Sequence, residues 1–317
     1  MRVRGSSGAG STVRWFAGSG FDGFAGSPAA SVARTGREPN QGGAGPAPER
    51  TPEPSNQHLS NLRTLRTLRT DSISYNHALV VLEVIVQTVD DARAAHEGGA
   101  DRLEVVRDVR VGGLTPALSL VSAIQDATPL PLRVMVRENR GFTIGPGELP
   151  ALRAAAASLE ALRIDGVVMG FARDGKVMLD DLSRVLERTP RLRVTFHRAF
   201  DTLHAPLDAL DALAGVPQID RILTDGGPGA PLERSARLAA LGDRARARGG
   251  GIAIVAGSGV DEEALTVFAA TACVHEAHVG RAARADGTAD GPVSAARVRR
   301  LRDIADGRAQ WSRSCSV

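Results

Sequence analysis

The sequence predicts an α/β fold, a closed (β/α)8 barrel, on three observations. Short runs rich in Val, Ile and Leu alternate with longer amphipathic runs between residues 80 and 306. Each strand and helix unit takes about 30 residues, the spacing expected of such a barrel. Polar side chains also recur on one face of several strands, and an open sheet with helices on both faces would not accommodate them easily.

The predicted strands are short and bounded by turn residues or by helical patterns. They cover 80–86, 101–106, 132–137, 166–171, 193–199, 220–225, 252–256 and 274–280. The clearest helical patterns are 88–98, 147–163, 206–214, 261–272 and 294–306. Thr115 before Pro116 is typical of a helix start, and the acidic residues at 180–181 and 261–263 suit the positive amino ends of helices.

Alternation along the strands predicts which side chains enter the barrel. Residues two apart share a face, and in the first, second, third and fifth strands one face is apolar while the other is mixed or polar. The apolar face is expected to meet the helices. The predicted inward residues are Glu83, Ile85, Gln87, Glu104, Val106, Arg133, Met135, Arg137, Thr195 and His197.

The chain outside the barrel has a different composition. Residues 1–58 contain eleven Gly and six Pro, about 29%, a level typical of low-complexity unfolded chain. We therefore predict a disordered N-terminal leader at 1–77, a barrel domain at 78–306 and a flexible C-terminal tail at 307–317.

Charge and cysteine content exclude several protein classes. Residues 1–79 hold nine Arg and five acidic residues, which leaves 30 basic and 31 acidic residues in 80–317 and no electrostatic footprint for nucleic acid. Cys273 and Cys315 have no Cys-x-x-Cys spacing, so a disulfide scaffold and a zinc ribbon are not expected. No apolar run approaches the length of a membrane span. A cytoplasmic location with no membrane partner is expected.

Six segments resemble one known family. They are Leu82-Glu83-Val84, Gly99-Ala100-Asp101-Arg102-Leu103-Glu104, Gly112-Gly113-Leu114-Thr115-Pro116, Val194-Thr195-Phe196-His197-Arg198-Ala199-Phe200-Asp201, Arg221-Ile222-Leu223-Thr224 and Ala256-Gly257-Ser258-Gly259-Val260. In this order they resemble the CutC copper homeostasis protein family, whose fold is a TIM barrel. The resemblance runs from about Val80 to Asp306 and leaves out the leader.

The resemblance implies a role in copper homeostasis and a homo-oligomer. Family members proposed to bind copper carry cysteines two residues beyond the glutamates of the first two strands, and here those positions are Ile85 and Val106. Copper(I) selects sulfur ligands, which neither side chain offers. Copper is therefore implied by the resemblance alone, and no metal ligand or other cofactor is assigned. The loop at 137–142 also departs from the family pattern.

Four residues are the candidate catalytic group: Glu83, Glu104, His197 and Arg137. Two carboxylates in a barrel interior must be paired or must shift their pKa values, because an isolated buried charge is too costly. In one interpretation they form a structural ion-pair network. In the other, Glu83 or Glu104 is a general acid or base, His197 is its proton partner and Arg137 holds an anionic group.

Further residues lie where strands end, at the face of the barrel that carries active sites. The candidate ligand-binding residues are Arg198, Asp201, Thr224, Gly257, Ser258, Gly259, His278 and Arg281. The glycines after the seventh and eighth strands favour a small anionic or phosphorylated ligand bound through backbone N–H groups. Alternatively they make tight turns, and the acids at 261–263 would repel phosphate.

Three functions stay open at this point. The first is a CutC-like role in copper homeostasis without the thiolate ligands. The second is a metal-independent barrel enzyme that acts on a small anionic metabolite, and the third is a binding or regulatory barrel without chemistry. A metal held by His197 and His278 with Glu276 or Asp201 is a weaker alternative, because histidine pairs are more often hydrogen-bonded than ligating.

Overall fold

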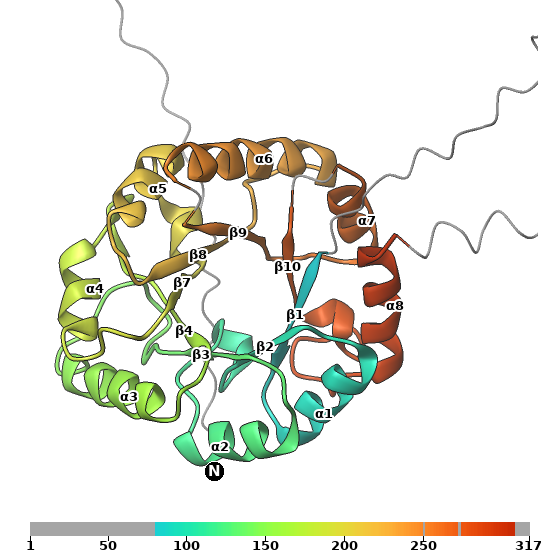
Figure 1. The fold of residues 1–317 in the computed structure, drawn as a ribbon, viewed down its shortest axis with the longest axis horizontal. Helices are drawn as coiled ribbons and strands as arrows, with labels where there is room; N and C mark the ends of the chain where they lie inside the picture. Colours follow the sequence, from blue (N-terminus) through green and yellow to red (C-terminus); the bar gives the residue numbers. More distant parts are fainter. Residues whose placement is uncertain (1–79, 250, 272–273, 308–317) are drawn as a thin grey trace, which may run out of the picture. The chain divides into compact units, whose positions relative to one another are not determined.

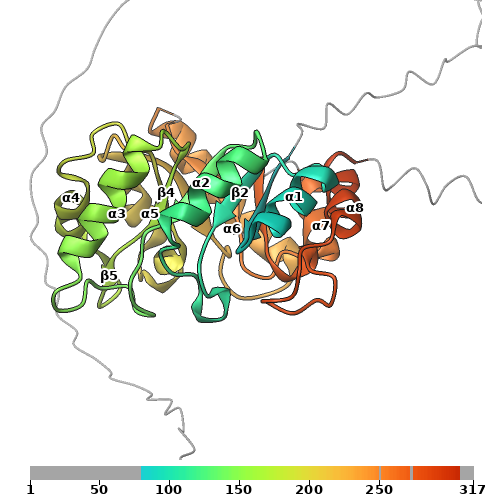
Figure 2. The same cartoon turned by 90° about the horizontal axis from the view of Figure 1, so that it is seen from below.

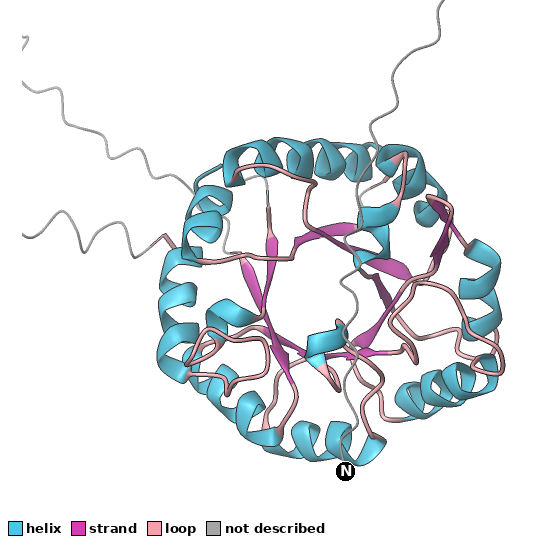
Figure 3. Cartoon of the chain, turned by 180° about the vertical axis from the view of Figure 1, so that it is seen from behind, coloured by secondary structure: helices cyan, strands magenta, loops and turns pink. Residues whose placement is uncertain are grey.

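The computed structural model describes residues 80–249, 251–271 and 274–307. Eight parallel strands close into a barrel, and helices surround them on the outside (Figure 1). Seen from the opposite end, the same ring of strands lies inside the same shell of helices (Figure 3). The predicted leader and all of the predicted tail beyond residue 307 lie outside the described residues.

The barrel strands follow one another around the ring in chain order, and the last closes on the first. In the ring order β1-β2-β3-β4-β7-β8-β9-β10 they are Val81–Val86, Arg102–Val105, Leu132–Met135, Gly166–Met169, Val194–Phe196, Ile219–Thr224, Ala253–Ala256 and Glu276–Val279. Each lies within or beside a predicted strand. The prediction of a closed (β/α)8 barrel is thus confirmed.

Within the described ranges, eight helices cover the strands: α1 (Val89–Gly98), α2 (Leu118–Ala127), α3 (Leu149–Ala161), α4 (Leu179–Leu186), α5 (Pro206–Ala214), α6 (Pro231–Ala247), α7 (Glu262–Thr271) and α8 (Ala295–Ala305). Short 3-10 turns follow three strands, at Val109–Val111, Arg198–Thr202 and Arg281–Ala283. A small hairpin, β5 (Ala172–Arg173) with β6 (Lys176–Val177), follows β4. In side view β5 lies at the end of the barrel to which the strands point (Figure 2).

One predicted helix start is wrong. Thr115 does not cap α2, whose N-cap is Ala117. Instead the Thr115 hydroxyl lies 3.0 Å from the carbonyl oxygen and 2.9 Å from the backbone nitrogen of Arg137. The side chain that resembles a cap thus joins the loop after β2 to the end of β3. The acidic residues predicted at helix starts do lie in the first turns of α4 and α7.

Strand alternation separates two apolar regions. The main core lies between strands and helices and contains the outward residues Leu82, Val84 and Val86. A second buried cluster consists of Ile85, Val106, Met135 and Val168, from four neighbouring strands. The predicted facing of the first three strands is therefore confirmed.

The amino-terminal ends of the strands are closed by ion pairs. Arg133 is fully buried, and its guanidinium donates to Asp165 at 2.6 Å and to both oxygens of Asp220 at 2.9 and 2.7 Å. Arg221 pairs with Asp220 at 2.5 Å and with Glu276 at 2.9 Å. A buried charge costs several kcal/mol unless its partners are in place, so these pairs depend on one another.

Arg133→Leu is expected to lower the free energy of unfolding by about 3 kcal/mol, because it removes one charged hydrogen bond from Asp165 and two from Asp220, and both carboxylates are partly buried. Urea unfolding of the full chain measures this. Arg93 pairs with Asp90 on the exposed surface of α1, so Arg93→Leu is expected to cost less than about 1 kcal/mol. An equal decrease in the free energy of unfolding of the two variants would contradict the stabilising role of the buried Arg133 ion pairs.

Candidate functional site

A cavity of about 710 Å³ opens at the carboxyl-terminal ends of the barrel strands. Apolar side chains of Ile85, Met135 and Leu223 line part of it. Its polar lining includes Glu104, His197, His278 and Asp261, and four arginines, Arg137, Arg198, Arg281 and Arg297. The cavity is therefore where the fold was expected to place a ligand.

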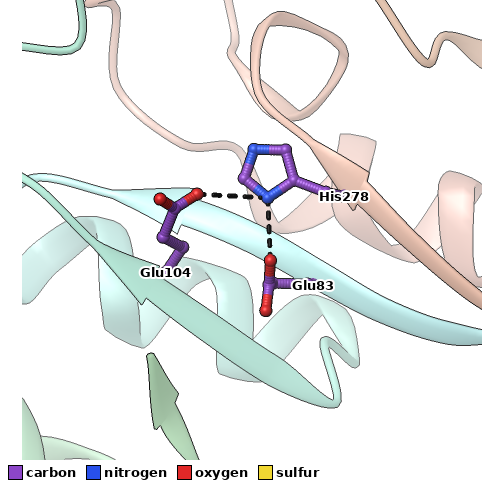
Figure 4. A group of neighbouring side chains, drawn as sticks. All are labelled: Glu83, Glu104 and His278. Atoms are coloured by element: carbon purple, nitrogen blue, oxygen red, sulfur yellow. Dashed lines mark hydrogen bonds and ion pairs between the residues drawn. The ribbon is translucent and has the colours of Figure 1, made fainter. Parts of the chain in front are cut away.

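Glu83, Glu104 and His278 come together inside the barrel (Figure 4). Nδ1 of His278 lies 2.9 Å from Oε1 of Glu83 and 3.2 Å from Oε2 of Glu104. Their strands are neighbours in the ring, β10, β1 and β2, and Glu83 stands opposite His278 in the strand register. Both glutamate side chains are 2% exposed, and that of His278 is 11% exposed.

Arg102 holds Glu83 from the other side. Its Nε donates to Oε2 of Glu83 at 2.5 Å, and its Nη2 donates to Oε2 of Glu276 at 2.5 Å. Arg102 and Glu276 are both buried, so the pairs are shielded from solvent. Arg102 was not among the predicted site residues, although it shares the strand face of Glu104 and alternation would have found it.

The charges of this group shift its pKa values in opposite directions. Burial opposes ionisation of Glu83, but Arg102 and His278 outweigh it and hold its pKa well below the usual range. Burial, together with the charge of Glu83, raises the pKa of Glu104 to about 7. Burial disfavours the charged form of His278, but Glu104 and Glu83 outweigh it and raise its pKa. Glu104 is thus the carboxyl group of the cluster that lacks a full counter-charge.

His197 is not the partner of either glutamate. It lies on β7's carboxyl end, four strands away from β1 around the ring, so the predicted pairing is wrong. Its Nδ1 accepts the backbone N–H of Ala199 at 3.1 Å, and the ring of Phe142 meets it edge-on at 5.3 Å. Burial lowers the pKa of His197 to about 3, and Arg137 and Arg198 act in the same direction. A neutral ring that accepts at Nδ1 carries its proton on Nε2.

Arg137 likewise does not join the glutamates. Its guanidinium donates to the carbonyl oxygens of Gly112 at 3.2 Å and Gly141 at 3.3 Å, and also to that of Arg140, and it lies over the ring of Phe142. The side chain is buried and tethers two loops at the cavity. Among the described residues, no carboxylate lies within ion-pair distance of Arg137.

Three predicted ligand-binding residues serve the scaffold instead. Asp201 accepts the hydroxyl of Thr224 at 2.6 Å and the N–H of Asp225 at 3.1 Å, and neither Asp201 nor Thr224 lines the cavity. Gly257 also lies outside the lining, and a Cβ there would overlap Leu223. Its carbonyl oxygen accepts from Arg234 at 2.9 Å. The structure thus gives these three residues internal hydrogen bonds or packing contacts in place of a position in the cavity lining.

The other predicted ligand-binding residues do line the cavity. They are Arg198, Ser258, Gly259, His278 and Arg281. Arg198 pairs with Asp201 at 3.2 Å. Asp261 caps its own helix by accepting the N–H of Ala264 at 2.9 Å. Arg297, at the start of α8, also lines the cavity, and sequence reasoning missed it because a helix start gives no signal of pointing toward the barrel axis.

The cavity does not offer the ligands that copper(I) prefers. Ile85 and Val106, at the positions where the resemblance implies cysteines, lie in the buried apolar cluster beside Met135. A thioether from Met135 is the only sulfur in the lining of this cavity among the described residues. Cys273 and Cys315 lie outside the described residues. The donors present are carboxylate and imidazole groups, so this site does not fit a thiolate-bound copper(I) ion.

These features define a parallel (β/α)8 barrel with a polar cavity at the carboxyl ends of its strands. The sequence profile of the CutC family matches residues 80–283. The chain therefore belongs to the CutC family.

Proteins from bacteria and mammals share this similarity. The chain is 34% identical over 219 residues to a family protein CutC of Caulobacter vibrioides, which covers 68% of this chain and 84% of the relative. It is 32% identical over 187 residues to the human copper homeostasis protein cutC homolog, covering 58% and 67%. The crystal structure of CutC from Streptococcus agalactiae aligns with a TM-score of 0.57 at 24% identity, over 63% of this chain and 97% of that one. This last likeness shows the fold.

The depressed pKa of His197 predicts how stability responds to acid. Between pH 7 and pH 5 the unfolded chain gains a proton at this position while the folded chain, with a pKa of about 3, does not. His197 is therefore expected to reduce the free energy of unfolding by about 2 kcal/mol over this interval. Urea unfolding of wild type and His197→Asn at both pH values measures the difference, and an equal loss in the two proteins would contradict the buried neutral ring.

Proposed function

We propose that this protein has a role in copper homeostasis and that its barrel contributes by binding a small anionic molecule. The first part is supported by family membership and by the names of the human and mouse relatives, both copper homeostasis protein cutC homologs. The second part is supported by the cavity itself. A cytoplasmic location belongs to the same proposal. No helix in the described part of the chain is long and apolar enough to cross a membrane.

Uncompensated arginines around the cavity carry the proposal of an anionic ligand. Arg137, Arg281 and Arg297 line it, and none of them has a carboxylate within ion-pair distance among the described residues. The acidic residues of the lining are Glu104 and Asp261. Three guanidinium groups without a paired carboxylate against two carboxyl groups give the mouth a positive field, which concentrates and orients anions.

Hydrogen-bond donors complete this binding surface. A guanidinium presents its N–H groups in a planar fork that matches a carboxylate or a phosphate. His197 lines the same cavity and keeps its proton on Nε2, so it can donate to a ligand oxygen without adding charge. Bound in this way, a small molecule with one anionic group would place its remaining atoms toward Glu104 and His278 at the cavity lining.

Copper homeostasis and anion binding are compatible if copper is not held directly by the barrel. Ile85 and Val106 occupy the two positions at which the resemblance implies cysteines, so the thiolate donors are missing there. The role would then depend on the ligand of the cavity. A second candidate, a barrel without any ligand, is disfavoured because it leaves Arg281 and Arg297 at one opening without a carboxylate partner among the described residues.

Arg281→Gln and Arg297→Gln are each expected to weaken the binding of inorganic phosphate to the full chain about tenfold, since each removes one charged donor. Phosphate-dependent stabilisation against heat measures the affinity. Arg300→Gln is the matched control, because Arg300 lies on the same helix as Arg297, pairs with Glu262 at 2.7 Å and does not line the cavity. Equal phosphate affinity in all three variants, or no stabilisation of the wild type, would refute anion binding at this mouth.

Copper binding is tested in a background of Cys273→Ser and Cys315→Ser. In this background we expect no submicromolar affinity for copper(I) in an anaerobic competition with a chromogenic chelator. Adding Ile85→Cys with Val106→Cys is expected to create that affinity, because the two side chains pack in one cluster at the cavity. Tight copper(I) binding before the two cysteines are introduced would show that the barrel uses other ligands.

A further inference from the structure

Three potential ligand atoms converge at the floor of the cavity. One oxygen of Glu83, one oxygen of Glu104 and a ring nitrogen of His278 all lie within 4.8 Å of one another (Figure 4). They come from three adjacent strands, so the barrel backbone holds them in place. Sites built on strands are more precise than sites built on loops.

The spacing of these atoms suits a bound cation. Two ligands at about 2.1 Å from a metal ion lie about 3.0 Å apart at a right angle and about 3.4 Å apart at the tetrahedral angle. The observed separations from Nδ1 of His278 are 2.9 Å to Glu83 and 3.2 Å to Glu104. Both fall within or next to this range, so an ion could enter with small side-chain movements.

A single proton satisfies this arrangement poorly. Nδ1 of His278 can carry one proton, which can point along one of its two short approaches to a carboxylate. Glu83 has Arg102 as a further partner, but in the described chain His278 is the one side chain within ion-pair distance of Glu104. Glu104 is 2% exposed and also lines the cavity. A buried carboxylate with one shared donor is left short of positive charge.

The residues behind the three ligands are already arranged to support an ion. Arg102 donates to Oε2 of Glu83, which leaves Oε1 directed at His278. The charge of Arg102 is balanced by Glu276, which it contacts at 2.5 Å. Such outer contacts fix the orientation of metal ligands. Glu104 and His278 line the cavity, so the positions of the ion not filled by protein would face the ligand space.

We propose that Glu83, Glu104 and His278 bind one divalent metal ion of borderline or hard character, such as Zn²⁺ or Mn²⁺. The donor set is two carboxylates and one imidazole, which suits these ions and not copper(I). The open positions would be available to water or to an anionic ligand held by the arginines above. The site does not depend on that anion, and the two proposals fail separately.

Titration of the full chain, freed of metal by a chelator, with Mn²⁺ tests the proposal. Electron paramagnetic resonance counts free Mn²⁺, and we expect one Mn²⁺ bound per chain with a micromolar dissociation constant. Glu104→Gln keeps the shape of the side chain, removes its charge, and is expected to weaken binding about tenfold or more. His278→Gln is expected to do the same, and circular dichroism checks that each variant is folded.

His275→Gln is the matched control, since this exposed histidine lies three residues before His278 and outside the group of three. Its Mn²⁺ affinity is expected to equal that of the wild type. Absence of Mn²⁺ binding by the wild type up to millimolar concentration would overturn the site, and so would equal affinities in wild type and Glu104→Gln. Absence of phosphate binding by the wild type, with Mn²⁺ binding intact, would leave this site standing and refute the anion proposal.

Discussion

Charges inside the closed barrel have to be neutralised by other residues inside the barrel. The pattern of these ion pairs determines which groups of the candidate site keep an unbalanced charge. Arg102 lies between Glu83 and Glu276, Arg221 between Glu276 and Asp220, and Arg133 between Asp220 and Asp165. This chain of pairs crosses the barrel from β2 to β8 and back to β3. Every carboxylate in it has a guanidinium, whereas Glu104 has His278 as its one ion-pair partner within the described part of the chain.

The interior therefore changes along the barrel axis. The amino-terminal end is filled by the ion pairs, and the group of Glu83, Glu104 and His278 follows. The apolar cluster of Ile85, Val106, Met135 and Val168 lies along β1 to β4. The arginines gather at the opening. An anion drawn to the arginines would meet the proposed cation site, while Ile85 and Val106 in the apolar cluster offer no thiolate. This arrangement connects the two proposals without making either depend on copper in the barrel.

The sequence predicted the fold and the facing of the strands well, because alternation is a local property. Glu83, Ile85 and Glu104 point inward as their positions require. Alternation does not say where around the ring a strand lies, and the error over His197 follows from this. β7 stands four strands from β1, whereas β10 closes the barrel beside β1 and supplies His278. Barrel topology, applied together with alternation, would have favoured His278 from the sequence.

The roles of loop residues were less predictable, because several hydrogen-bond partners lie within reach of each polar side chain. Asp201 and Thr224 bond to each other, and the guanidinium of Arg137 is taken up by backbone carbonyl groups of two loops. Polar residues at the ends of strands satisfy loop backbone as readily as a ligand, and no spacing rule separates the two uses. Arg297 reaches the cavity from a helix start, which only the three-dimensional path of the last loop determines.

X-ray diffraction from crystals of the full chain grown with Zn²⁺, recorded at the zinc absorption edge, examines the organisation of the interior most directly. The account predicts one anomalous peak inside the barrel, about 2.0–2.2 Å from Glu83, Glu104 and His278, with Arg102 behind Glu83. An interior without such a peak, or glutamates at 83 and 104 that turn toward the helices, would contradict it.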